Sequence, residues 1–170
     1  LLQSGSGGDL SGLGLLIIAS GLASSIRAPV WGRLSDRSSR LVMVLASAAA
    51  GLVGLLTWCL ARVDAELLQA PFVFAALFLL LNIAHSGVRL GRKVYLVDMA
   101  DGDTRAAMVA VSNTVIGVAM LAGGLVGIIA DLYDAAAVIL VLGIGSLGAA
   151  IYALRLTEVQ AGPNGFEPVP

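Results

Sequence analysis

A short charged turn, residues 31–40, contains the side chains of this sequence that are best placed to do chemistry. Asp36 lies there among Arg33, Arg37 and Arg40, and the turn separates two long apolar runs. A carboxylate at the end of a membrane helix must be hydrated or paired, so the chemistry expected here is the making and breaking of ion pairs. We interpret the turn as a gating hinge between two membrane helices. The alternative is a solvated turn whose charges only fix the orientation of the chain.

A second group of polar side chains falls on one face of the helix expected over residues 71–97. At 100° per residue its members lie within about 120° of one another: Asn82, His85, Ser86, Arg89, Arg92 and Lys93. Such a stripe faces a water-filled pathway or another helix rather than lipid. Asn82 and His85 are deep enough to line a cavity, with hydrogen bonding between helices as the alternative. If the stripe lines such a pathway, Arg89 favours an anionic group on whatever enters it, whereas Arg92 and Lys93 are expected to reach the membrane surface.

His85 and a few other polar residues complete the candidate cavity. His85 is the only histidine of the chain, and histidine can exchange protons near neutral pH. A packed, hydrogen-bonded imidazole is the alternative. Ser20, Ser24 and Arg27 share one face of the first apolar run and form a candidate second wall, although serines often serve only helix packing. Asn113 adds a similar face on a later run.

Five apolar segments must position these groups. Each is about as long as a bilayer-spanning helix, roughly 20 residues. The spans are expected at residues 10–34, 41–61, 71–97, 106–130 and 135–154. Residues 1–9 are expected to form an external stub, and the polar residues 156–170 a disordered cytoplasmic tail.

The composition agrees with a membrane location. The chain has 170 residues, 58% hydrophobic and 12% charged, whereas soluble domains carry about twice this charge. Apolar runs with short polar breaks indicate an all-α, polytopic bundle of membrane helices. With Cys59 and His85 each alone of its type, we expect no metal site and no cofactor. Nucleic acid is not expected as a partner.

The basic residues indicate the orientation. If the 31–40 turn is cytoplasmic, Arg62 is the only one of the ten Lys and Arg residues that falls outside. Positive residues favour the cytoplasmic side, so the C-terminus is expected in the cytoplasm and the chain in the cytoplasmic (inner) membrane. Five aromatic residues near span ends are expected to be interfacial anchors: Trp31, Trp58, Tyr95, Tyr133 and Tyr152.

The charged turn resembles the signature loop of major facilitator superfamily transporters, which joins the second and third helices of each six-helix half. The family pattern is Gly-x-Leu-x-Asp-Arg-x-Gly-Arg, and this sequence matches it at Gly32, Leu34, Asp36, Arg37 and Arg40. Ser39 stands where the family usually has glycine. The resemblance implies that Asp36 is a latch between the two halves, which breaks when the cytoplasmic side opens.

Two further segments are similar to the same family. Asp98 and Arg105 fall in a segment like the cytoplasmic loop between the fourth and fifth helices of a half, and they are expected to form an ion pair at the cytoplasmic rim. The glycine-rich stretch 117–127 lies where some members carry a Gly-Pro antiporter motif, but the proline is missing and antiport is not implied. The match covers five helices of a half and lacks its first. We interpret them as helices eight to twelve, with helices two to six as the alternative.

The resemblance implies part of a secondary transporter that moves a small solute by alternating access. The lipid bilayer and the missing N-terminal half of the same chain are then its partners, and the solute is unidentified. The first residues, Leu1-Leu2-Gln3, read as the middle of a longer chain. No convergent acid–base or metal cluster is evident within a span, so we expect no enzyme. A receptor-like or assembly subunit and, less favoured, a membrane-embedded enzyme are the alternatives.

The segment Gly143–Gly148 matches the dinucleotide-binding pattern G-x-G-x-x-G. It lies inside an apolar span with no strand before it, so nucleotide binding is not expected. Close helix packing explains its glycines better, as it does Gly123 and Gly127.

Overall fold

The computed structural model describes residues 10–124 and 126–160. This part of the chain is helical and contains no strand, which confirms the predicted all-α bundle. The side chains of several residues in the first helix, Ser24 and Arg27 among them, lie outside the described residues, as does that of Ile129.

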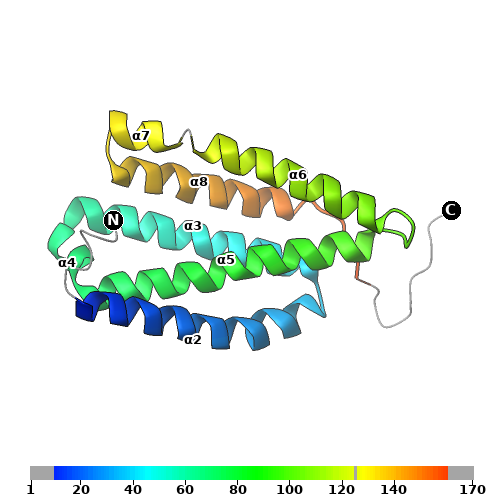
Figure 1. The fold of residues 1–170 in the computed structure, drawn as a ribbon, viewed down its shortest axis with the longest axis horizontal. Helices are drawn as coiled ribbons and strands as arrows, with labels where there is room; N and C mark the ends of the chain where they lie inside the picture. The colour runs from blue at the N-terminus through cyan, green and yellow to red at the C-terminus, as the bar shows by residue number, and fades with distance from the viewer. Residues whose placement is uncertain (1–9, 125, 161–170) are drawn as a thin grey trace.

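Seven helices lie within the described ranges (Figure 1). They are α2 (Leu10–Ser35), α3 (Ser39–Val63), α4 (Ala65–Gln69), α5 (Pro71–Met99), α6 (Arg105–Gly123), α7 (Val126–Leu132) and α8 (Ala135–Ala153). Among the described residues, four stretches are long and apolar enough to cross a membrane: α3, α5, α6 together with α7, and α8. That α2 also crosses stays a prediction.

Polar residues set where several helices begin. Ser38 caps α3, because its hydroxyl accepts a hydrogen bond from the Leu41 N–H at 3.0 Å. Asp134 caps α8 in the same way, with its carboxylate 2.6 Å from the Ala137 nitrogen. Serine and aspartate are favoured there because their oxygens satisfy backbone N–H groups that have no partner in the helix. Pro71, which lacks an N–H group, starts α5.

The span expected over residues 106–130 is split into α6 and α7. Helix α6 ends at Gly123, and the N–H of Gly124 then donates to the Leu121 carbonyl at 3.1 Å, one residue closer than in an α-helix. Two consecutive glycines lower the helix propensity at this point, which accounts for the break.

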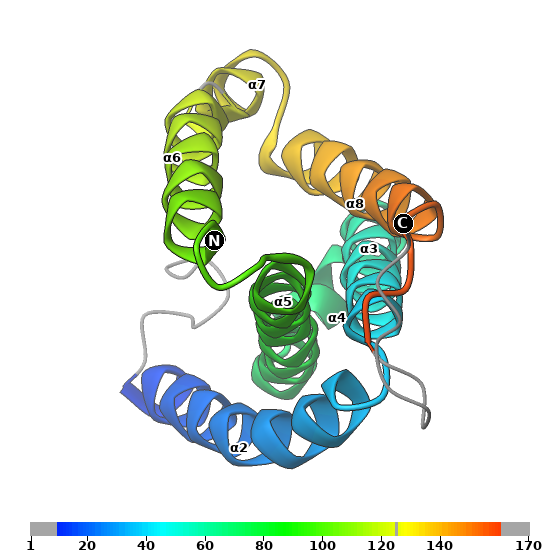
Figure 2. The same cartoon turned by 90° about the vertical axis from the view of Figure 1, so that its right-hand side faces the viewer.

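Helix α5 lies at the centre of the bundle (Figure 2). Helix α2 packs on one side of it and α3 on another, and α8 packs against α3. Helix α6 stands apart and touches α5 only slightly. None of the described residues of α6 is buried. Four of the five long helices therefore form one packed unit, and α6 lies beside it.

The core of this unit is a junction of three helices. Trp31 on α2 and Val42 and Ala46 on α3 form a buried cluster. The indole Nε1–H of Trp31 donates to the Ile83 carbonyl on α5 at 2.7 Å. Gly87 makes room for the ring, because a Cβ atom built there would lie 2.6 Å from the indole. A glycine notch on α5 therefore seats an aromatic ring from α2.

This packing corrects the prediction that the aromatic residues near span ends are interfacial anchors. Trp31 and Tyr95 are both 8% exposed and belong to the core. Tyr133 and Tyr152 are 78% and 69% exposed. The prediction was wrong for the first two. For Trp31 the reason is that Gly87 on α5 leaves space for its ring inside the bundle.

Glycines also bring α3 and α8 together. A Cβ on Gly51 would lie 2.9 Å from the Gly143 carbonyl oxygen, and one on Gly54 would lie 3.1 Å from the Gly143 Cα atom. Close packing was thus predicted correctly for Gly143. For four other glycines it stays a prediction, because such a Cβ atom would have nothing within 4 Å among the described residues: Gly123, Gly127, Gly145 and Gly148.

Candidate functional site

The predicted gating turn is a tight backbone turn between α2 and α3. The Asp36 N–H donates to the Gly32 carbonyl at 3.1 Å, and the Ser38 N–H donates to the Leu34 carbonyl at 3.0 Å. The side chains of Asp36 and Arg37 are exposed. Because the helix ends fix the backbone on both sides, the turn holds these charges at one end of the bundle.

The carboxylate of Asp36 is not part of an ion pair within the described chain. The ion pairs found there join Arg40 to Glu158, with 3.5 Å between Nε and Oε2, and Arg62 to Asp134. Arg40 also donates from Nη1 to the Leu156 carbonyl at 3.1 Å. Of the three arginines expected near Asp36, Arg40 is therefore engaged by residues that follow α8.

Asp98 and Arg105 lie at the same end of the bundle as Asp36, where the turn between α5 and α6 is seen in Figure 1. Their expected ion pair is not formed among the described residues. Asp98 instead accepts a hydrogen bond at Oδ2 from the Gln160 side chain at 2.9 Å. Arg105 is exposed at the first residue of α6.

The structure describes the first residues of the tail that is expected to be disordered. Residues 156–160 lie against the gating turn, while residues 161–170 lie outside the described part. Gln160 and Glu158, which make most of these contacts, were missed by the sequence analysis. Their partners are 62 to 125 residues away along the chain, so no local pattern could have indicated them.

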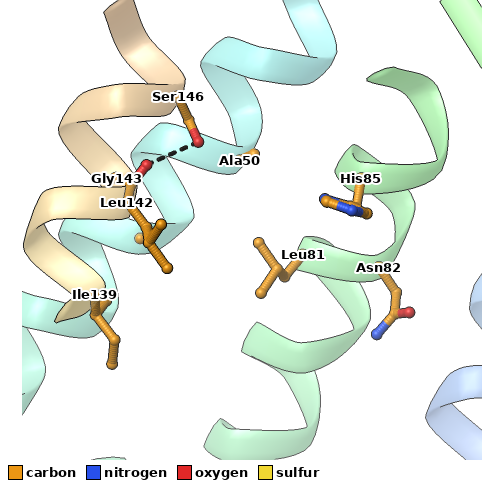
Figure 3. A pocket seen from close by; sticks show the side chains of 9 residues that line it. Ala50, Leu81, Asn82, His85, Ile139, Leu142, Gly143 and Ser146 are labelled. Atoms are coloured by element: carbon orange, nitrogen blue, oxygen red, sulfur yellow. Dashed lines mark hydrogen bonds between the residues drawn. The ribbon is translucent and has the colours of Figure 1, made fainter. Parts of the chain in front are cut away.

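Two of the predicted cavity residues lie together in an open pocket of about 460 Å³. Asn82 and His85 are among its lining residues on α5, and in Figure 3 Leu81 of the same helix points toward the α8 side chains. Its lining is Ala50, Gly54, Leu81, Asn82, His85, Ile139, Leu142, Gly143 and Ser146. Ser146 was missed, although a serine in so apolar a span was a signal. Its hydroxyl donates to the Leu142 carbonyl at 2.9 Å.

The other candidate cavity residues do not line this pocket. Ser86 is half-buried and donates to the Ile83 carbonyl of its own helix at 2.7 Å. Arg89 on α5 and Asn113 on α6 are exposed. Ser20 belongs to α2, which lies across α5 from α8 in Figure 2.

The side chains of Ser24 and Arg27 lie outside the described residues, so the second cavity wall stays a prediction. The half-buried Arg92 donates from Nη1 to the Ser112 hydroxyl of α6 at 3.3 Å. This contact joins α5 to α6, whereas we had expected Arg92 to reach the membrane surface. In the part of the chain that the structure describes, no three His, Cys, Asp or Glu residues are grouped so as to hold a metal ion.

Comparison with known proteins agrees with these features. No curated protein and no solved structure matches the chain. The sequence model of the Major Facilitator Superfamily matches residues 1–169, which include the gating turn, the turn between α5 and α6, and all the helices described above. Together with the long apolar helices, this match shows that the protein is a multi-pass integral membrane protein and belongs to the Major Facilitator Superfamily of transporters.

Proposed function

We propose that this chain is most of one half of a secondary transporter that moves a small solute across the cytoplasmic membrane by alternating access. In such a transporter two helical bundles rock around a site near the middle of the membrane. The turn at Asp36 would be a cytoplasmic latch to the other half. The C-terminus would lie in the cytoplasm, as the basic residues predict.

The environment of Asp36 is the observation that carries this proposal. Its carboxylate is exposed, and within the described residues no basic side chain lies within 4 Å of it. Arg40, four residues after Asp36, is paired with Glu158 instead. A carboxylate at the end of a membrane helix is stabilised by a partner of opposite charge. A group on the other half, such as the positive end of a helix dipole at its N-terminus, would therefore pair with Asp36.

The loose contact of α6 supports the proposal that a helix is missing. Five large apolar side chains of α6 are between 61% and 81% exposed: Val111, Val115, Val118, Met120 and Leu121. Lipid covers some apolar faces of a membrane helix, but a helix with no buried residue lacks its packing partners. The first helix of the half would contact α6, and we place the chain as helices eight to twelve, with two to six as the alternative.

The pocket between α3, α5 and α8 supports a solute pathway beside α5. Asn82, His85 and Ser146 bring polar groups to a lining that is otherwise apolar or small. Ligand sites commonly combine an apolar lining with a few polar groups that orient the ligand. Arg89, exposed one turn from His85, favours a solute with an anionic group.

The test is flux through the full-length protein in proteoliposomes, screened with radiolabelled anionic and neutral small solutes. For a solute that is transported, Asp36→Asn should lower the flux at least about tenfold, since a lost charge pairing changes a conformational equilibrium by this order. Asp131→Asn, the same change at an exposed aspartate of α7, is the control and should keep normal flux. Normal flux through a well-folded Asp36→Asn protein would exclude the latch.

A further inference from the structure

A short segment joins the end of α8 to the gating turn. We call its residues, Leu156–Gln160, the strap. In Figure 2 it runs in orange and red from the end of α8 past the end of α3. It has no regular secondary structure, so the contacts of its side chains and carbonyls hold it in place.

The carboxamide of Gln160 connects three helices. Its Nε2 group donates to the Ser35 carbonyl at 2.8 Å, at the end of α2, and to Asp98 Oδ2 at 2.9 Å, near the end of α5. Its Oε1 atom accepts the N–H of Ser39, the first residue of α3. Both donor hydrogens and the acceptor oxygen of the side chain are therefore used.

Glu158 and Arg40 fasten the strap at a second point. Glu158 Oε2 accepts a hydrogen bond from the Ser38 hydroxyl and lies 3.5 Å from Arg40 Nε. Arg40 also donates to the Leu156 carbonyl. Since Ser35 and Ser39 flank the turn and Ser38 lies within it, the strap holds the turn that carries Asp36 from both sides.

We propose that the strap is a clasp on the cytoplasmic gate and that Gln160 is the positioning residue for the Asp36 turn. This inference rests on the proposed function of that turn. Gln160 ties the turn to Asp98 of α5 and so joins the two segments that are both expected to move at the gate. The strap has to release the turn before α2, α3 and α5 can separate at this end.

The hydrogen bonds at position 160 require glutamine and exclude glutamate, which has nearly the same shape. A glutamate at position 160 would have the same shape, but it could not donate to the Ser35 carbonyl, and its charge would repel Asp98. Placing two hydrogen-bond acceptors against each other with no donor between them costs more free energy than losing one neutral hydrogen bond at the surface. Gln160→Glu therefore breaks the clasp with almost no change in volume.

The first experiment measures the clasp without any solute. Hydrogen–deuterium exchange of the full-length protein in detergent should show the Ser39 amide region, residues 36–42, exchanging about tenfold faster in Gln160→Glu, since lost hydrogen bonds change the opening equilibrium by this order. Gln69→Glu, the same change on the exposed side of α4 at the other end, is the control and should exchange as wild type. Unchanged exchange in Gln160→Glu would overturn the proposal.

The second experiment asks whether release is needed for transport. In a protein whose native cysteines are replaced by serine, Ser38→Cys and Glu158→Cys are joined by a short, reducible bifunctional thiol reagent. Flux into proteoliposomes should fall at least tenfold on cross-linking and return on reduction, while each single variant treated with the reagent keeps its flux. Full flux through the cross-linked protein would overturn the clasp but leave the transporter intact. Absence of flux in the wild type would instead refute the proposed function, and the exchange experiment would still decide whether the strap holds the turn.

Discussion

The junction of α2, α3 and α5 should be the part of the bundle most sensitive to one added methyl group. In Gly87→Ala the new Cβ atom would lie 2.6 Å from Trp31 Cε2 and 2.7 Å from Ala46 Cβ, where ordinary contact begins at 3.4 Å. Neither neighbour can give way cheaply. The indole is held by its hydrogen bond to the Ile83 carbonyl, and the Ala46 Cβ atom is fixed to the backbone of α3. Helix α5 would have to move away from both other helices.

The magnitude follows from three terms. Overfilling a packed core costs about 1–3 kcal/mol, and a strained or lost Trp31 hydrogen bond adds about 0.5–1.5 kcal/mol. Alanine regains about 1 kcal/mol over glycine in helix propensity. Gly87→Ala should therefore lower the free energy of unfolding by about 0.5–3.5 kcal/mol. Gly148→Ala, the same change on α8 with nothing within 4 Å of the new atom, should be neutral or slightly stabilising.

The assay is thermal unfolding of the full-length protein in detergent, followed by the fraction that stays monodisperse. We expect a lower apparent Tm for Gly87→Ala and an equal or higher one for Gly148→Ala. If both variants have the Tm of the wild type, the close contact between Trp31 and Gly87 does not exist. If both are destabilised alike, glycine is required for backbone reasons and not for the contact argued above.

Two further predictions concern single polar groups. Ser39 is fully buried, and its hydroxyl has no hydrogen-bond partner among the described residues. Because a buried unpaired hydroxyl is unfavourable, Ser39→Ala should raise the unfolding free energy by about 1 kcal/mol and so raise the Tm. A lower Tm would mean that the hydroxyl is paired. Asp134 both caps α8 and pairs with Arg62 at 2.9 Å. Asp134→Ala should lower the unfolding free energy by about 1 kcal/mol through the lost cap. Arg62→Ala should lower it by under about 1 kcal/mol, because that ion pair is exposed. Equal losses of stability in the melting assay would assign the whole effect to the ion pair.

The sequence was sufficient to locate the long helices, because each lies in a long apolar run between polar breaks, but it missed the break between α6 and α7. A bilayer requires such runs, so hydrophobicity alone locates them. It was not sufficient to predict that Trp31 packs inside the bundle. A tryptophan near the end of a span has the same local sequence whether it anchors in lipid headgroups or fits a glycine notch on another helix. Only the meeting of Trp31 with Gly87, 56 positions along the numbering, distinguishes the two.

The candidate site was predictable to the extent that it is local. The turn around Asp36 has its own pattern, and Asn82 and His85 share a helix face by their spacing, so both could be found from the sequence. The strap could not, because its polar residues resemble any exposed tail. Nothing near Gln160 in the sequence indicates that its carboxamide meets Ser35, Ser39 and Asp98.

The two sides of α5 indicate how this half would move. One side is built from small or buried residues, Ala84, Gly87 and Gly91, and a Cβ at Gly91 would lie 2.8 Å from Met43 Cγ and 3.1 Å from the Ser39 carbonyl. The other side presents His85 and Arg89, which are exposed. A helix packed this closely cannot rotate about its axis without breaking contact with α3, because packed interfaces switch between discrete arrangements and do not deform continuously. Along this tightly packed stretch α2, α3 and α5 therefore stay together, and their separation at the gate is confined to the helix ends, at the turns and at the strap that joins them.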